Sequence, residues 1–360
     1  VLPRFFAPGE LGLTTTLTSV STLLAQVAAF GFASVGIRFF PYFRNRENGH
    51  HGFLPLLLGV PLLSFVAVAA LFWLGKPILL GFYAREVAAL LMGYLWRIGE
   101  LHWRPRRAAL AVRPVRELLS MGGFTLLSSL SGSIIMYIDT LMVGSQVSLA
   151  AAGIYAIAFN ISTALAIPAR SLNKIAFPLL ANYWKEQNLA GMADFYRRTT
   201  RLNALIGCLL ALGIGLNLPF IYSLMRTEYA QGTLVVLLLL GSRLFDGITG
   251  LNGLILVTSP RYRFDLVFNV SLSLLIIVLN LLLIPRLGMV GAAVAAVAAQ
   301  VSINLARTWF VWRSFGMQPF TWQIPLILLI TAAAGLAGWL VPTLASPLLT
   351  MLLRSTVITA

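Results

Sequence analysis

Apolar stretches long enough to cross a lipid bilayer recur along almost the whole chain and set its fold class. A membrane-spanning helix needs about 20 mostly apolar residues, and inside the bilayer its backbone must satisfy its own hydrogen bonds. With 59% hydrophobic and 10% charged residues, the chain cannot surround a soluble core with polar surface. We therefore predict an all-α integral membrane protein, a polytopic helical bundle of about ten spans near 11–33, 53–75, 77–96, 118–142, 147–169, 203–224, 230–256, 264–284, 287–312 and 323–345.

The placement of the basic residues supports these spans. Arg and Lys gather in every second predicted loop, whereas the loops between hold only Arg4, Lys76, Arg226 and Arg286. By the positive-inside rule, the basic loops lie in the cytoplasm. The basic residues behind the net charge of +15 are distributed over alternate loops, so they indicate the topology. They form no single patch that would bind nucleic acid. We expect a multi-pass protein with membrane lipids around it and no nucleic-acid partner.

Two segments of the chain share one pattern. Residues 12–41 and 153–178 each begin with Gly, continue as an apolar run with Ser and Thr, and end with an Arg followed by Phe and Pro. Duplication on this scale is typical of membrane transporters. A third glycine-led start at 287–291 leaves an alternative open, namely that the pattern reflects only how such helices begin.

The stretch 77–96 is a poor span, because Arg85 and Glu86 lie near its middle. Each charge costs roughly 2.5–3.5 kcal/mol there, and adjacent residues point apart on a helix. It is either a native broken helix or a join across an internal deletion. We expect an incomplete N-terminal lobe and basic cytoplasmic linker at 1–117, a six-helix C-terminal lobe at 118–316, and a further helix with the start of another at 317–360.

Charged side chains within the spans are the candidate functional residues, because burying an unpaired charge in a bilayer is costly. Arg243 and Asp246 are three apart and share a helix face, either as a local pair or as a cation held toward an anionic ligand. Asp139 accepts hydrogen bonds from another helix, binds a proton or cation, or balances a cavity arginine. Arg38 and Arg170 hold corresponding places in the two repeats and either reach the membrane interface or flank a cavity mouth.

A polar stripe on 287–312 consists of Gln300, Asn304 and Arg307, and it either joins helices or contacts substrate. The amphipathic stretch 182–201 predicts a helix along the membrane surface. The sequence does not indicate an enzyme, because the His residues lie in predicted cytoplasmic loops and no nucleophile, metal or phosphate-binding motif is present. We expect no catalytic residue, no metal and no cofactor, and we predict transport.

Several motifs resemble those of polysaccharide flippases, which export lipid-linked oligosaccharides in bacterial O-antigen, lipopolysaccharide and capsule pathways. The family lies in the superfamily of multidrug, oligosaccharidyl-lipid and polysaccharide exporters. The resemblance covers most of the chain and is best between Val115 and Pro319. The motifs are Ile138-Asp139-Thr140-Leu141-Met142, Gly153-Ile154-Tyr155, Ile167-Pro168-Ala169-Arg170, Glu228-Tyr229-Ala230, Gly250-Leu251-Asn252-Gly253, Ile284-Pro285-Arg286-Leu287-Gly288 and Gly291-Ala292-Ala293.

The resemblance implies two six-helix lobes around a central cavity in the bacterial cytoplasmic (inner) membrane. Against that plan the chain is expected to be truncated at both ends and internally. The implied mechanism is alternating access, in which a lipid pyrophosphate-linked glycan crosses the membrane, with polysaccharide assembly enzymes as further partners. For this mechanism the candidate substrate-binding residues are Arg38, Arg170, Arg243, Asn252 and Arg307, and the candidate ion-coupling or counter-ion residues are Asp139 and Asp246.

Three alternatives are also compatible with the sequence. An ion-coupled multidrug exporter would need an acidic, aromatic cavity for cationic substrates, whereas the charges within the spans are as often Arg as Asp. A lipid II flippase shares the expected architecture and an anionic substrate. A non-functional fragment is the third alternative, and the poor span at 77–96 favours it.

Overall fold

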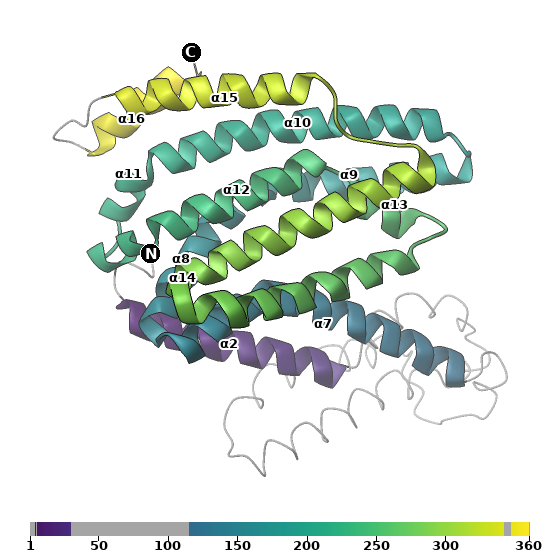
Figure 1. The fold of residues 1–360 in the computed structure, drawn as a ribbon, viewed down its shortest axis with the longest axis horizontal. Helices are drawn as coiled ribbons and strands as arrows, with labels where there is room; N and C mark the ends of the chain where they lie inside the picture. The colour runs from purple at the N-terminus through teal and green to yellow at the C-terminus, as the bar shows by residue number, and fades with distance from the viewer. Residues whose placement is uncertain (1–3, 5, 30–114, 342–346, 360) are drawn as a thin grey trace, which may run out of the picture. The chain divides into compact units, whose positions relative to one another are not determined.

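The computed structural model describes residues 4, 6–29, 115–341 and 347–359. These residues form helices joined by short turns, and no strand occurs among them, which confirms the predicted all-α fold. Figure 1 labels these α-helices along the chain. The elements are α2 (Pro8–Ala29), α7 (Val115–Gln146), α8 (Leu149–Thr163), α9 (Ala166–Lys185), α10 (Leu189–Leu216), α11 (Leu218–Ser223), the 3₁₀ helix η2 (Thr227–Gly232), α12 (Thr233–Thr249), α13 (Asn252–Thr258), α14 (Arg263–Phe315), α15 (Gln323–Leu340) and α16 (Pro347–Thr359).

Four stretches of the described chain are long and apolar enough to cross a membrane, namely α10, η2 with α12, α14 and α15. The pair α8 and α9 makes a fifth if its bend of 51° lies within one span. The chain is therefore a multi-pass helical membrane protein, as predicted. The predicted spans 53–75 and 77–96 lie outside the described residues.

Gly288 divides α14 into two spans. Its backbone (φ 60°, ψ −139°) is open to glycine but strained for other residues. With 53 residues, an unbroken α14 would reach about 80 Å, far more than the hydrocarbon core of about 30 Å. In Figure 1 the two halves run back past each other from this bend. The break confirms the predicted boundary between the spans 264–284 and 287–312.

Other predicted segments are interrupted as well, including 147–169 between α8 and α9 and 203–224 between α10 and α11. The predicted span 230–256 breaks where Gly250 (φ 69°) ends α12 and α13 follows. The predicted surface helix 182–201 does not form as one element, because the chain turns at 186–188, where Gln187 has a φ of 54°. Asn188 then begins α10 by accepting a hydrogen bond from the Gly191 N–H at 2.8 Å. The amphipathic residues 182–201 therefore belong to the end of α9 and the start of α10.

Helix α12 lies at the centre of the described bundle. It packs against α8, α10 and α14, while α15 covers the other side of α10 and α16 packs on α15. Figure 1 shows α15, α10, α12 and the second half of α14 side by side. The core includes Val235, Val236, Leu239 and Leu240 of α12, all 4% exposed or less. Because α12 is surrounded by α8, α10 and α14, polar side chains on α12 lie close to these helices.

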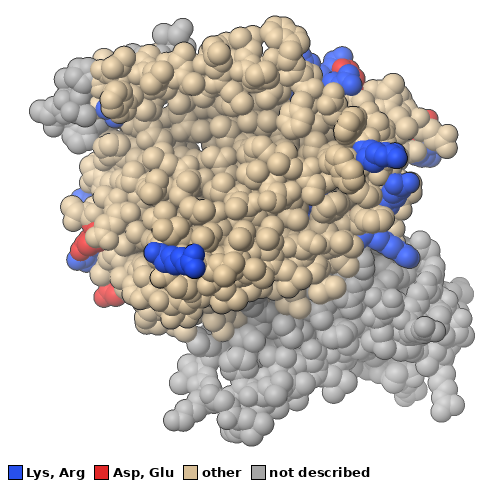
Figure 2. All heavy atoms as spheres, viewed as in Figure 1, with Lys and Arg blue, Asp and Glu red and all other residues tan. Residues whose placement is uncertain are grey.

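The visible charged residues are unevenly distributed on one face of the described chain. On the face shown in Figure 2, Lys, Arg, Asp and Glu lie mainly toward the left and right edges, with an almost uncharged band between them. Many large apolar side chains are exposed as well, among them Leu274, Val278 and Leu281 of α14. An exposed apolar belt of this kind is what a bilayer would cover.

Contacts group residues up to 16 with residues from 138 onward into one compact unit. The second unit, residues 17–137, is described only at 17–29 and 115–137. All contacts discussed below lie within the first unit.

Candidate functional site

Arg243 lies on α12, within one of the apolar spans. Its guanidinium carbon is 5.1 Å from the centre of the Phe159 ring on α8, which is a cation–π contact. No described residue forms a hydrogen bond or an ion pair with Arg243, so its five N–H donors remain for another acceptor. A partly exposed guanidinium in this position can bind an anionic group.

Asp139 joins three helices near Arg243. Its carboxylate accepts a hydrogen bond from Tyr155 Oη of α8 at 2.9 Å and one from Asn280 Nδ2 of α14 at 2.7 Å. The side chain is buried, and Arg243 lies within electrostatic range of it. Of the alternatives that the sequence left open, hydrogen bonding from other helices is the one seen. The nearby positive charge also suits Asp139 to be a counter-ion of Arg243.

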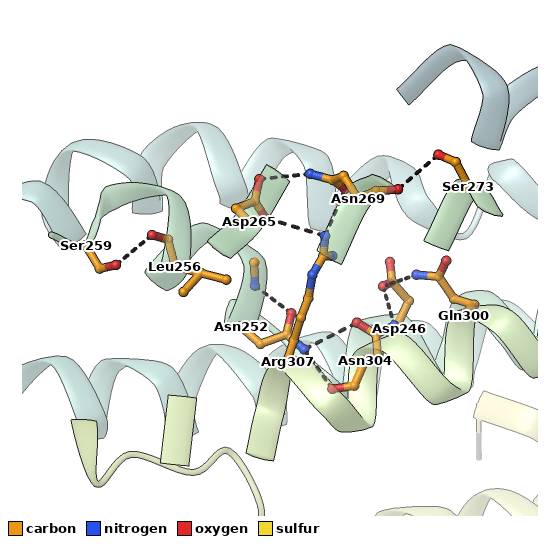
Figure 3. Close-up of polar contacts among 11 residues, drawn as sticks. Asp246, Asn252, Leu256, Ser259, Asp265, Asn269, Ser273, Gln300, Asn304 and Arg307 are labelled. Carbon is orange, nitrogen blue, oxygen red and sulfur yellow. Dashed lines mark hydrogen bonds and ion pairs between the residues drawn. The ribbon is translucent and has the colours of Figure 1, made fainter. Parts of the chain in front are cut away.

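Asp246 bonds to α14 and not to Arg243. Its Oδ1 accepts hydrogen bonds from Gln300 Nε2 at 2.8 Å and from Asn304 Nδ2 at 2.9 Å. Within the described chain the local Arg243–Asp246 ion pair considered from the sequence does not form. Asp246 therefore fastens α12 to the second half of α14, as Figure 3 shows. Its carboxylate forms no ion pair with Arg243.

Asn252 uses its amide to fasten the start of α13. Its Nδ2 lies 3.2 Å from both Asn304 Oδ1 and Thr308 Oγ1, and its Oδ1 accepts from the Gly253 N–H at 2.6 Å. The residue is buried, and the bonds to Asn304 are drawn in Figure 3. These contacts stabilise the break between α12 and α13.

Arg307, on the second half of α14, lies next to the start of α13 at Gly253. Its Nη2 donates to Asn269 Oδ1 at 2.8 Å and lies 3.4 Å from Asp265 Oδ1, in an ion pair whose side chains are 11% and 15% exposed. Its guanidinium also lies 5.9 Å from the ring centre of Phe268. Figure 3 shows the side chain crossing from one half of α14 to the other. Arg307 therefore already has a carboxylate partner of its own.

The two arginines of the repeats are placed differently. Arg170 lies on α9 and is exposed, with no hydrogen bond or ion pair to any described residue. Arg38 lies outside the described residues. The structure thus brings Arg243 and Asp139 into one cluster, and Asp246, Asn252 and Arg307 into another.

Several partners in these clusters were not predicted from the sequence. Tyr155 and Phe159, which contact Asp139 and Arg243, lie on the apolar helix α8, where an aromatic residue gives no sign of polar contact. Asp265, which pairs with Arg307, lies at the start of the predicted span 264–284 and is not among the candidate residues of the sequence analysis. A search for an acidic residue to match every arginine within a span could have found it.

Comparison with known proteins agrees with this fold. Residues 56–184 match the family described as polysaccharide biosynthesis protein. A solved structure titled lipid II flippase MurJ, inward closed conformation, is similar over 98% of this chain and 88% of its own, with a TM-score of 0.55 and 11% sequence identity. None of the curated proteins matches the chain. The family match over residues 56–184 and the shared fold both support the resemblance to flippases that the sequence motifs suggest.

Proposed function

We propose that this protein moves a lipid pyrophosphate-linked oligosaccharide across the bacterial cytoplasmic membrane by alternating access, for the synthesis of a surface polysaccharide. The matched polysaccharide biosynthesis family and the flippase fold support this function. Transport of this kind requires no enzymatic step by the chain itself. In this proposal the residues 1–117 and 118–316 act as two lobes, with the substrate between them.

The strongest support for an anionic substrate is the position of Arg243 within an apolar span. A guanidinium within an apolar span is costly unless something compensates its charge. Asp246, the carboxylate one turn away, bonds to two amides of α14, so it does not neutralise Arg243. Guanidinium groups bind phosphate oxygens in pairs of hydrogen bonds, and a pyrophosphate offers several such oxygens. An anionic headgroup therefore fits this cation better than a cationic drug does.

Asp139 has a supporting role in the proposal. Its buried carboxylate lies within electrostatic range of Arg243 and is fixed by Tyr155 and Asn280. When substrate leaves, this carboxylate is the nearest counter-charge for the guanidinium, and it can couple transport to a proton or cation gradient. Asp246, Asn252 and Arg307 keep α12, α13 and α14 in register, so they act on the substrate through the position of Arg243.

Arg38 and Arg170 complete the basic set of the proposal. Arg170 is exposed on α9, beyond the bend that follows α8. At the cytoplasmic end of its span, it can attract an anionic headgroup before the headgroup reaches Arg243. We propose the same role for Arg38, from its corresponding place in the first repeat.

A lipid II flippase is the second candidate, favoured by the fold shared with the solved flippase of that substrate. The test is a flipping assay with the purified protein in liposomes. Three fluorescent substrates are compared: a polyprenyl-pyrophosphate oligosaccharide, lipid II, and a lipophilic cation. The proposed function predicts protein-dependent flipping of the first above that of the other two.

Each other outcome counts against the proposal in its own way. Faster flipping of lipid II than of the oligosaccharide lipid would mean that the protein is a lipid II flippase, the second candidate. Transport of the cation alone would favour a multidrug exporter. A well-folded protein that moves none of the three would favour a chain without transport activity.

A further inference from the structure

Helices α2 and α8 cross with their backbones in direct contact at Gly12 and Gly153. A Cβ atom added to Gly12 would lie 1.7 Å from the carbonyl oxygen of Leu149. A Cβ atom added to Gly153 would lie 2.0 Å from the carbonyl oxygen of Pro8. Since both neighbours are backbone atoms, no side-chain rotation could make room. Only glycine permits this crossing on either helix.

The contact is reciprocal. Leu149 precedes Gly153 by four residues, and Pro8 precedes Gly12 by four residues, so each glycine faces the same position of the other helix. The hypothetical Cβ atoms lie 2.9 Å from Gly153 N and 2.8 Å from Gly12 N, which repeats the relationship. Such an exchange of equivalent contacts is the geometry of a two-fold axis. It relates the first turns of the two repeated segments.

The crossing lies at one end of both helices. Each glycine is four residues from the first residue of its helix, which corresponds to about 6 Å along the axis. The alternation of basic loops places this end outside the cytoplasm. Leu11 is buried here against the α7 core, and Tyr229 Oη donates to the Phe6 carbonyl oxygen at 3.2 Å. Several contacts therefore hold the outer end of α2 against the bundle.

Thr16 lies one turn inward from Gly12. Its hydroxyl oxygen is buried and has no hydrogen-bond partner among the described residues, and it faces α7, where a Cβ on Gly144 would lie 3.3 Å away. A buried hydroxyl without a partner costs about 1–3 kcal/mol, which water would relieve if the helices separated. The contact is thus tight at the glycines and carries an unsatisfied polar group just behind them.

We propose that the Gly12–Gly153 crossing is the outer gate of the transporter, a two-fold contact that closes the cavity on the outside and separates when substrate leaves. This inference rests on the alternating-access function proposed above. A pivot would keep its contact in every state and would lie near the middle of the helices. The crossing lies in their first turns instead, where a small rotation of either helix opens the largest gap.

The test uses a cysteine at position 16 as a reporter. Thr16→Cys is labelled by a membrane-impermeant maleimide from the outside only when the crossing opens. The natural Cys208 is buried and gives the background. Gly12→Ala and Gly153→Ala are each added to this reporter. Gly9→Ala is the matched control, because a Cβ at Gly9 on the same helix meets nothing within 4 Å.

We expect Gly12→Ala and Gly153→Ala each to raise the labelling rate about tenfold or more, a change of ~1.4 kcal/mol against the closed state, while Gly9→Ala leaves it unchanged. Alanine favours helix over glycine at all three positions, so helix propensity cannot explain a difference between them. Tyr229→Phe removes only the bond to Phe6 and is expected to raise labelling several-fold in a chain that still folds.

Equal labelling of the three glycine variants would overturn the gate. If the alanine variants do not fold, unchanged labelling of Tyr229→Phe overturns it. The readout needs no substrate, so it is separate from the flipping assay: a gate that fails this test leaves the flippase function standing, and a wild-type protein that fails to flip leaves the labelling result intact.

Discussion

Arg307 and Asp265 form an ion pair between the two halves of α14, 42 positions apart in the sequence, with an N–O distance of 3.4 Å. Gly288 reverses the chain between them. The pair therefore closes a helical hairpin at the end opposite its bend. Asn269 receives a second hydrogen bond from the same guanidinium nitrogen and fixes its orientation.

Replacing one partner of this pair should destabilise the protein strongly. Arg307→Gln leaves the Asp265 carboxylate with little exposure and no cation, which typically costs about 3–5 kcal/mol. The measurement is thermal unfolding in detergent. The control is Arg198→Gln, which breaks the exposed pair with Asp194 and should change stability by only about 0.5 kcal/mol. A double variant, Arg307→Gln with Asp265→Asn, should lose less than the sum of the single variants.

The bend at Gly288 should depend on glycine alone. An added Cβ there meets no atom within 4 Å, so the cost of Gly288→Ala comes from its backbone conformation, at about 1–3 kcal/mol. Gly241→Ala, within α12 and equally free of neighbours, should be neutral or slightly stabilising. Equal unfolding temperatures for the two variants would contradict the strained bend.

Asp246 should be replaceable by asparagine but not by leucine. Asn keeps an oxygen that can accept from Gln300 and Asn304, whereas Leu leaves both amides unpaired, at about 1–3 kcal/mol for each buried donor. Thermal unfolding of Asp246→Asn and Asp246→Leu measures the difference. Similar losses for both would mean that the negative charge, and not the hydrogen bonds, holds α12 to α14.

Asp139 should affect coupling more than folding. Asp139→Asn can still accept from Tyr155, and Asn280, whose Oδ1 has no partner among the described residues, can rotate its amide to accept in turn. We expect a well-folded protein in which flipping no longer accelerates with an imposed proton or sodium gradient. Asp194→Asn, at an exposed position, is the control. A gradient response that survives Asp139→Asn would remove the coupling role.

The sequence predicts the spans, their polarity and the division of α14, because a bilayer imposes length and apolarity locally along the chain. It also predicts Arg243, Asp139 and Asp246 as important positions, because charges are rare within spans. Spacing alone pairs Arg243 with Asp246, since residues three apart share a helix face. The amides of Gln300 and Asn304 compete for Asp246 from another helix, and no local pattern predicts that contact.

The breaks were harder to predict for a similar reason. A glycine within an apolar span is equally compatible with close helix packing, so it is the φ of 69° at Gly250 that identifies the end of α12. Asp139 receives hydrogen bonds from residues 16 and 141 positions away, so its partners depend on tertiary packing. Gly12 and Gly153 are different, since the sequence repeat already gave them equivalent places and the structure shows them in contact.

The most direct test of the account is the flipping rate of Arg243→Gln and Arg243→Lys with a polyprenyl-pyrophosphate oligosaccharide in liposomes. A charge-assisted hydrogen bond contributes about 1.5–3 kcal/mol, so Arg243→Gln should lower the rate by roughly ten- to a hundredfold. Lysine should restore part of it, because it keeps the charge without the paired donors. Arg286→Gln, which removes an exposed charge, should flip at the wild-type rate. If a well-folded Arg243→Gln protein also flips at that rate, Arg243 does not bind the substrate and the central claim is wrong.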